Sequence, residues 1–125
     1  MSITLVARNP VGDVDELEIS DDRWRQFVNL LDELECDTTS IGPDHSDKYA
    51  RARDTNAWAV ALQNGLAHDS IASVQHRDRL VPGGVRTDLV VSDSADVVSE
   101  LTEAQRAWLH SVVTFLKGCG GFDWY

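Results

Sequence analysis

Residues 115–125 read FLKGCGGFDWY, and this stretch decides how the chain is put together. Three glycines fall within four positions, and three aromatic residues follow within the last four. Lys117 suits the negative end of a helix dipole, and Gly118 is placed to be the left-handed residue that closes the helix. Gly120 and Gly121 then allow a sharp reversal of the chain. The pattern predicts a helix end, a turn and an aromatic tail.

The aromatic tail can be ordered or free. Ordering five backbone residues costs on the order of 5–10 kcal/mol. Burying Phe122 and Trp124 contributes roughly 2–3 kcal/mol each, and hydrogen bonds to a strand edge add to this. Because the terms nearly balance, we expect the tail to fold back onto the core or to join the sheet. The alternative is that Trp124 and Tyr125 stay partly exposed and bind a partner.

The helix before the tail has the clearest start signal in the chain. Thr102 and Gln105 form a capping-box pattern, and Glu103 places a carboxylate at the positive end of the dipole. The apolar positions behind them cover more than half of the helix circumference; they are Trp108, Leu109, Val112, Val113, Phe115 and Leu116. We therefore expect a broadly buried helix over 103–117 at the centre of the core.

The ending of the chain also resembles that of a known group of proteins. The stretch WLHSVVTFLKGCGGF, residues 108–122, is similar to the ending of small bacterial proteins of unassigned function. Those proteins finish in an amphipathic helix, a Phe-Leu or Phe-Cys pair, a Gly-Gly-Phe and one or two aromatic or apolar residues. The resemblance covers about the last 18 residues of this sequence. It implies that the glycine-aromatic ending belongs to the fold, and it implies no activity.

The N-terminal segment predicts a β-hairpin. SITLVAR (2–8) and DELEIS (15–20) alternate apolar and polar residues with a period of two, which is typical of strands. The turn chemistry lies between them in NPVGD (9–13). Leu17 and Ile19 share one side of the second strand, so its opposite side is wet and acidic.

The remaining segments complete an α+β pattern. A stripe of apolar residues predicts a helix over 21–34. A second helix is predicted over 55–67, because an alanine-rich segment follows a capping residue at Asp54 or Thr55. YARAR (49–53) and TDLVV (87–91) read as short strands, while HDSIASVQH (68–76) reads as a possible resumption of the second helix. The prediction is one α+β domain over 1–125, with a small, mostly antiparallel sheet that contains the hairpin and is packed by about three helices.

Composition bounds the class of protein. The chain has 125 residues, of which 42% are apolar, and a mean hydropathy of -0.26, all ordinary for a globular domain. No apolar run is long enough to span a membrane, and the first residues lack the pattern of a signal peptide. We therefore expect a cytoplasmic protein with no membrane contact. Cys36 and Cys119 are then most simply free thiols, with a disulfide between them as the alternative.

Charge is the strongest compositional feature. Twenty-one acids oppose eleven bases, for a net charge of -10 and an isoelectric point near 4.6. Such a surface repels phosphate, so we expect no direct binding of nucleic acid. Three interpretations of the acidity stay open: solubility or genome bias, a basic protein partner, or a salty cytoplasm. The last arises because aspartate far outnumbers glutamate and only two lysines occur.

The usual signs of catalysis and metal binding are weak. His68 and His76, eight positions apart, would lie about 12 Å from each other on one helix, too far for one metal. DHSD (44–47) lacks the spacing of a calcium loop. The glycines of GCGG (118–121) follow a helix, whereas phosphate cradles precede one. Cys119 lies at the negative end of a helix dipole, which raises the pKa of a thiol. We expect no metal, no cofactor and no catalytic residue.

Three functions remain open. The first is a non-enzymatic interaction protein, of immunity or antitoxin type or a modulator, that binds a basic protein. The second is a small enzyme or ligand-binding module with a pocket near His76, Arg77 and Arg79. The third is a self-associating subunit, with the tail aromatics forming a homodimer. The residues expected to bind a partner are Asp13, Asp15, Glu16, Glu18, Asp21, Asp22, Trp124 and Tyr125.

Overall fold

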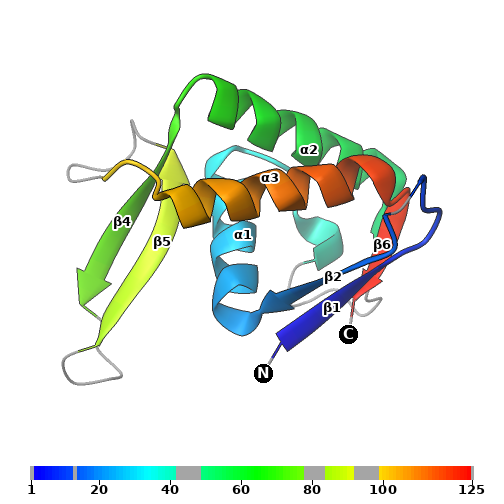
Figure 1. Ribbon diagram of the computed structural model, residues 1–125, viewed down its shortest axis with the longest axis horizontal. Coiled ribbons are helices and arrows are strands. Elements are labelled where there is room, and N and C mark those ends of the chain that lie inside the picture. The colour runs from blue at the N-terminus through cyan, green and yellow to red at the C-terminus, as the bar shows by residue number, and fades with distance from the viewer. Residues whose placement is uncertain (1, 13, 42–48, 78–83, 92–98, 125) are drawn as a thin grey trace.

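The computed structural model describes residues 2–12, 14–41, 49–77, 84–91 and 99–124 (Figure 1). Its elements follow one another along the chain as β1 (Ser2–Ala7), β2 (Glu16–Ser20), α1 (Asp21–Glu33), the 3-10 helix η1 (Thr39–Ile41), β3 (Tyr49–Arg51), α2 (Ala52–Ala67), β4 (Ile71–Arg77), β5 (Val85–Val91), α3 (Glu103–Gly118) and β6 (Gly121–Trp124). The predicted α+β class and the N-terminal hairpin are confirmed.

The strands form two antiparallel sheets, where the sequence suggested one. The larger has the order β2-β1-β6-β3, and β4 pairs with β5 in the smaller. Figure 1 shows the two sheets on opposite sides of α1, with α2 and α3 side by side along the top of the view. Polar side chains join the small sheet to α1, because Arg25 and Gln26 both donate to the carbonyl of Thr87 on β5.

The C-terminal tail joins the larger sheet as predicted. β6 lies between β1 and β3, with Phe122 opposite Ala7 on one side and Ala50 on the other. Phe122 is fully buried, and Trp124 is half-buried. Their rings belong to a chain of aromatic contacts that links α1, α2, α3 and β6 at centroid distances of 5.3–6.2 Å.

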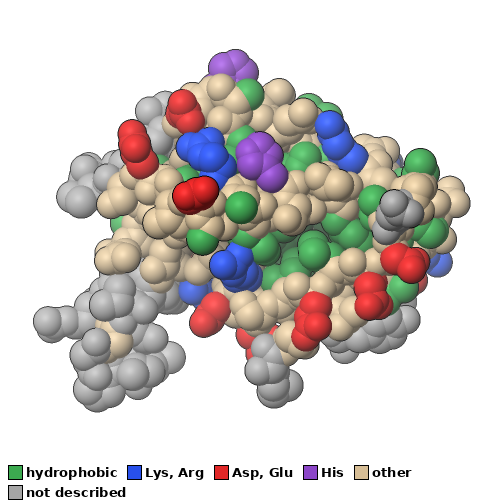
Figure 2. Space-filling view, viewed as in Figure 1, with side chains coloured by type: hydrophobic (Ala, Val, Ile, Leu, Met, Phe, Trp, Pro, Cys, Tyr) green, Lys and Arg blue, Asp and Glu red, His purple; other side chains and the backbone are tan. Residues whose placement is uncertain are grey.

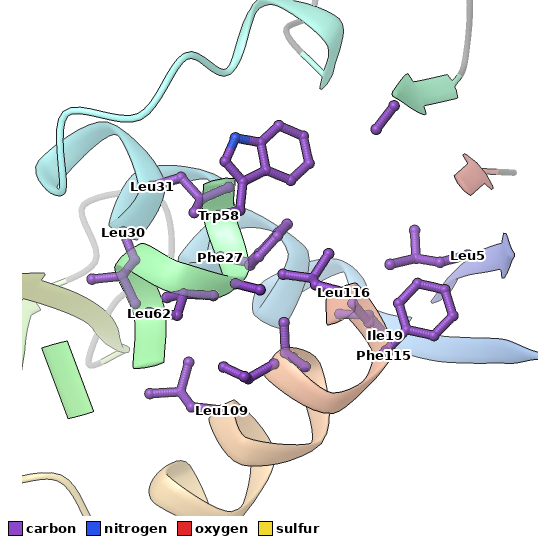
Figure 3. Packing of buried hydrophobic residues seen from close by; sticks show 14 of the residues in the cluster. Leu5, Ile19, Phe27, Leu30, Leu31, Trp58, Leu62, Leu109, Phe115 and Leu116 are labelled. Carbon is purple, nitrogen blue, oxygen red and sulfur yellow. The ribbon is translucent and has the colours of Figure 1, made fainter. Parts of the chain in front are cut away.

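The core forms where the three helices meet the inner face of the larger sheet (Figure 3). α3 contributes five buried apolar residues, so the expectation that it lies broadly buried is confirmed. Its predicted capping box is also present, with the amide of Gln105 donating to the Thr102 hydroxyl at 3.1 Å and the Thr102 amide donating to the Gln105 side chain at 2.9 Å. Cys36 and Cys119 are free thiols, as expected.

Two local predictions about turns and caps were wrong. Gly118 is the last residue of α3, and the left-handed positions are Gly120 (φ +62°) and Gly121 (φ +92°). The first left-handed residue after the helix therefore comes two positions later than predicted, while the reversal falls at Gly120 and Gly121 as expected. α2 begins at Ala52, before the expected caps, and its capping residue Arg51 makes no side-chain cap.

The segment after α2 is a strand, so the second helix does not resume over 68–76. Ile71 pairs with Val91 and Arg77 with Val85, so the partner strand β5 decides its conformation. Gly65 assists this arrangement from within α2, because a β-carbon there would lie 2.7 Å from the Cδ1 atom of Ile71. His68 caps α2 while His76 lies on β4, so the two histidines do not share a helix. Within the described ranges, no helix is long and apolar enough to cross a membrane.

Candidate functional site

The outer face of the larger sheet carries acids from two strands, β2 and β6. Glu18 lies opposite Thr4, and Glu16 lies opposite Val6, whose neighbour on the other side is Asp123 of β6. Glu16 and Glu18 are exposed, whereas Ile19 of the same strand is buried and faces the helices. The alternation expected from the sequence is therefore present. The Ser2 hydroxyl donates to a carboxylate oxygen of Glu18 at 2.7 Å, which orients that side chain.

The start of α1 extends this acidic region. Ser20 ends β2 and caps α1, accepting a hydrogen bond from the amide of Arg23 at 3.3 Å. Asp21 and Asp22 follow in the first turn and are exposed, where the positive end of the helix dipole stabilises their charge. Together with the hairpin they define what we call the acidic surface, made of Asp15, Glu16, Glu18, Asp21 and Asp22.

The ion pairs of the described residues all lie outside the acidic surface. Within the described part of the chain, ion pairs join Arg8 to Asp123, Arg25 to Asp88, Arg53 to Asp54 and Arg106 to Asp69, and none involves the five acids. In Figure 2, red side chains follow the lower edge of the molecule over the β1–β2 hairpin. On α1, the guanidinium of Arg23 lies 4.9 Å above the ring of Trp108 on α3. Among the described residues, the five carboxylates of the acidic surface therefore have no ion-pair partner.

The structure separates the expected aromatic contacts from the acids. Trp124 is on the inner face of the sheet, where its ring lies 5.3 Å from that of Trp24, so it does not share a surface with Glu16 and Glu18. The Trp124 side chain lies on the same face of β6 as the buried Phe122, because the two residues are two positions apart in a strand. The sequence pattern already indicated this shared face. Asp13 and Tyr125 lie outside the described residues.

Two cavities lie elsewhere, and neither adjoins the acidic surface. The larger, about 400 Å³, lies between the end of α2, β4 and the start of α3, where Arg106 pairs with Asp69 at 3.2 Å. The smaller, about 220 Å³, has Arg51 and Arg53 in its wall together with Asp37. The sequence pointed instead to His76, Arg77 and Arg79, whose side chains lie outside the described part. No sequence motif marks the residues that line either cavity.

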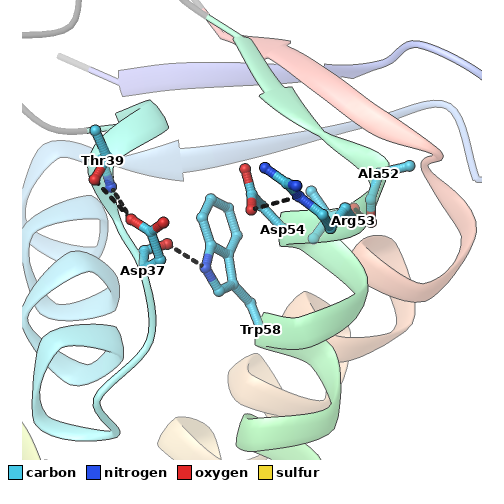
Figure 4. Close-up of polar contacts among 7 residues, drawn as sticks. Asp37, Thr39, Ala52, Arg53, Asp54 and Trp58 are labelled. Carbon is cyan, nitrogen blue, oxygen red and sulfur yellow. Dashed lines mark hydrogen bonds and ion pairs between the residues drawn. The ribbon is translucent and has the colours of Figure 1, made fainter.

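The polar groups around the smaller cavity mainly support the fold (Figure 4). The indole nitrogen of Trp58 donates to the carbonyl of Asp37 at 3.0 Å, which ties α2 to the loop after α1. Hydrogen bonds from the hydroxyl and the amide of Thr39 lower the pKa of the Asp37 carboxyl below its usual range. Arg53 and Asp54 approach each other only to 3.9 Å.

The two thiols are poorly suited to nucleophilic chemistry. Burial raises the pKa of Cys119, and burial with the nearby Asp32 carboxylate raises the pKa of Cys36. The direction expected for Cys119 is confirmed, but its main cause is burial and not the helix dipole. Among the residues the structure describes, no group of three or more His, Cys, Asp or Glu is placed to hold a metal ion. DHSD (44–47) lies outside these residues.

No family model, no curated protein and no solved structure matches this chain. The resemblance of its ending to small bacterial proteins therefore stays a prediction.

Proposed function

We propose that this chain is a non-enzymatic interaction protein that binds a basic protein partner through its acidic surface. Immunity proteins, antitoxins and modulators of basic enzymes are the classes that this description fits. The observation that carries the proposal is the run of five exposed carboxylates, from Asp15 to Asp22, with no ion pair among the described residues. A cytoplasmic location belongs to the same proposal.

Electrostatics supports a partner of this charge. The net charge of -10 gives the whole molecule a negative field, and the acidic surface concentrates it over one hairpin and one helix end. A basic partner would be steered toward this surface, would gain ion pairs on docking, and would release with added salt. Nucleic acid would be repelled by the same field.

A ligand-binding module is the second candidate. The cavity of about 400 Å³ beside Ile71 and Leu101 supports it, because its wall combines apolar side chains with the Arg106–Asp69 ion pair. This function predicts a rise in thermal midpoint with a small molecule. A broad metabolite and metal screen without any shift would count against it.

Self-association through the tail is less well supported. Trp124 is half-buried against Trp24, which leaves less of its surface for a second copy. A homodimer stays a prediction that sedimentation equilibrium can test.

The experiment for the main proposal is a pull-down from the lysate of the source cell, with the salt concentration raised in steps. We expect a basic protein to be retained and to elute near about 0.5 M salt, where the Debye length is only a few ångströms. The double variant E16Q/E18Q should lose this protein at lower salt. The matched control is E100Q/E103Q, which removes the same charge from exposed acids at the start of α3. Equal behaviour of the two variants would contradict the proposal.

A further inference from the structure

Strand β2 presents an open edge beside the acidic surface. It is the first strand in the order β2-β1-β6-β3, and in the part of the chain that the structure describes no other strand pairs with its far side. The amide of Ala7 donates to the carbonyl of Asp15 at 2.8 Å. Hydrogen-bonded pairs alternate along an antiparallel ladder, so Leu17 and Ile19 exchange backbone hydrogen bonds with β1. The backbone groups of Glu16 and Glu18 therefore point away from the sheet.

The opposite side of β1 confirms this alternation. The amide of Arg8 donates to the carbonyl of Gly121 on β6 at 2.9 Å. Val6, two residues earlier, then also bonds toward β6, while Leu5 and Ala7 bond toward β2. The direction of the Glu16 and Glu18 amides thus follows from two separate hydrogen bonds.

The side chains along the β2 edge alternate in chemistry. Glu16 and Glu18 are exposed on the outer face, while Leu17 is half-buried and Ile19 is buried on the inner face. Figure 2 shows hydrophobic side chains gathered in a hollow between α3 and the row of acids on the hairpin. Val14 and Leu17 near the hairpin and Trp108 on α3 pack against the core and are partly exposed. A strand added here would meet carboxylates on one face and apolar surface on the other.

We propose that β2 accepts an extended segment of the partner, which adds to this edge as a fifth strand. The segment carries basic side chains alternating with apolar ones. Its backbone pairs with Glu16 and Glu18, its basic side chains face their carboxylates, and its apolar side chains cover Leu17. This inference rests on the proposed function and specifies how the basic partner is held.

Charge disfavours a second copy of this chain as the occupant. An antiparallel pair of β2 strands sets acids of one copy opposite acids of the other, and like charges directly across a ladder are destabilising. The far edge of the sheet is less suitable for a basic segment, because β3 is only three residues long and carries Arg51.

The test uses three short synthetic peptides with blocked ends. The first alternates lysine and valine, the second has the same residues in two blocks, and the third is the alternating peptide with N-methyl groups on the amides that would face β2. We expect the alternating peptide to bind about tenfold more tightly than the other two, because it alone completes the ladder. Hydrogen exchange should slow at the Glu16 and Glu18 amides. The Leu17 and Ile19 amides, already bonded to β1, should change little.

A matched pair of variants separates charge from pairing. Glu16→Pro removes the outward amide at the first residue of the strand, where proline is tolerated and no bond to β1 is lost. It should abolish the preference for the alternating peptide. Glu16→Gln keeps the amide and should weaken all three peptides together. Circular dichroism and the thermal midpoint check the fold, and the N-methylated peptide gives the same comparison without any variant.

Each other outcome overturns the inference in a recognisable way. Equal, salt-sensitive binding of all three peptides without amide protection would leave the proposed function standing and remove strand addition. If no peptide binds and no basic protein is retained from lysate, both the proposed function and strand addition are contradicted. Protection of Glu16 and Glu18 in the free protein with a doubled mass would assign the edge to a second copy.

Discussion

Strands β5 and β6 each place a buried apolar side chain in the core, Leu89 and Phe122, but β5 is also attached to α1 by polar side chains. On β6, Phe122 is fully buried, with ring centroids of Trp58 and Phe115 at 6.2 and 6.1 Å. On β5, Arg25 and Gln26 of α1 donate to the Thr87 carbonyl at 3.3 and 3.0 Å. β6 is a central strand, so its backbone groups are already paired and its attachment is apolar.

The position of each strand explains the contrast. β5 is at an edge of its two-stranded sheet, where open backbone groups invite pairing with other chains. Polar side chains from α1 occupy part of this edge, and Arg25 also forms an ion pair with the nearly buried Asp88. The edge of β2 has no such cover among the described residues. Within one molecule, one edge is closed by a helix and another is left available.

The largest expected effect comes from Phe122→Ala, which breaks the apolar attachment of β6. Removing a fully buried ring should lower the free energy of unfolding by about 3–5 kcal/mol. Urea unfolding followed by tryptophan fluorescence measures it. The control is Val60→Ala, because Val60 is 56% exposed and should change stability by no more than about 0.5 kcal/mol. Similar losses of stability in the two variants would mean that packing of the Phe122 ring does not hold β6 in place.

A smaller loss is expected when the polar attachment of β5 is broken. Arg25→Met keeps the length of the side chain but removes the ion pair with Asp88, whose side chain is 9% exposed. We expect a loss of about 2 kcal/mol in the free energy of unfolding. The double variant R25M/D88N should recover part of it. A double variant no more stable than Arg25→Met alone would show that the ion pair is not what holds β5.

The polar side of β6 should matter little. Arg8 pairs with Asp123 at 3.6 Å and lies 4.7 Å from the centre of the Tyr49 ring, but both charged side chains are at least 40% exposed. Arg8→Ala should lower the free energy of unfolding by about 0.5–1 kcal/mol. Thermal unfolding at low and high salt would check this, since the ion-pair part is screened by salt. A loss of stability as large as that of Phe122→Ala would show that polar contacts hold β6 as strongly as apolar packing does.

The smallest effect is a change in the alkaline limb of the stability curve. Burial raises the folded-state pKa of Cys119 above its ordinary value of 9.0. Below that value both states hold the proton, and above it the unfolded chain loses the proton first, so stability falls as pH rises. Cys119→Ala should reduce this slope. Denaturant midpoints between about pH 8 and 10.5 measure it, and an unchanged slope would show that the thiol is not responsible.

Local signals predicted much of the fold correctly. The capping box at Thr102 and Gln105 marks the start of α3 unambiguously, and the alternation around Leu17 and Ile19 indicates which side of β2 is wet. These patterns depend only on neighbours along the chain. The conformation of residues 71–76 was not predictable in this way, because pairing with β5 makes this segment a strand where a resumed helix was expected.

The candidate site was predictable in its charge but not in its edge. The acids from Asp15 to Asp22 were expected to be exposed, and they are. Whether β2 is an edge depends on strand order, and that order is set by contacts between β1 and β6, which are over one hundred residues apart. No pattern in either segment specifies that neighbour. Trp124 was assigned to the site for its chemistry, while burial beside Trp24 places it elsewhere.

The central position of β6 in the sheet also affects how the protein folds during synthesis. Because β6 lies between β1 and β3, a ribosome has to release the chain as far as Trp124 before Leu5 and Ala50 obtain the strand that joins them. Until then the edge of β1 that faces away from β2 lacks its partner, and assembly involves closing a loop of more than a hundred residues. An unpaired strand edge of this kind favours aggregation of a nascent chain until β6 emerges.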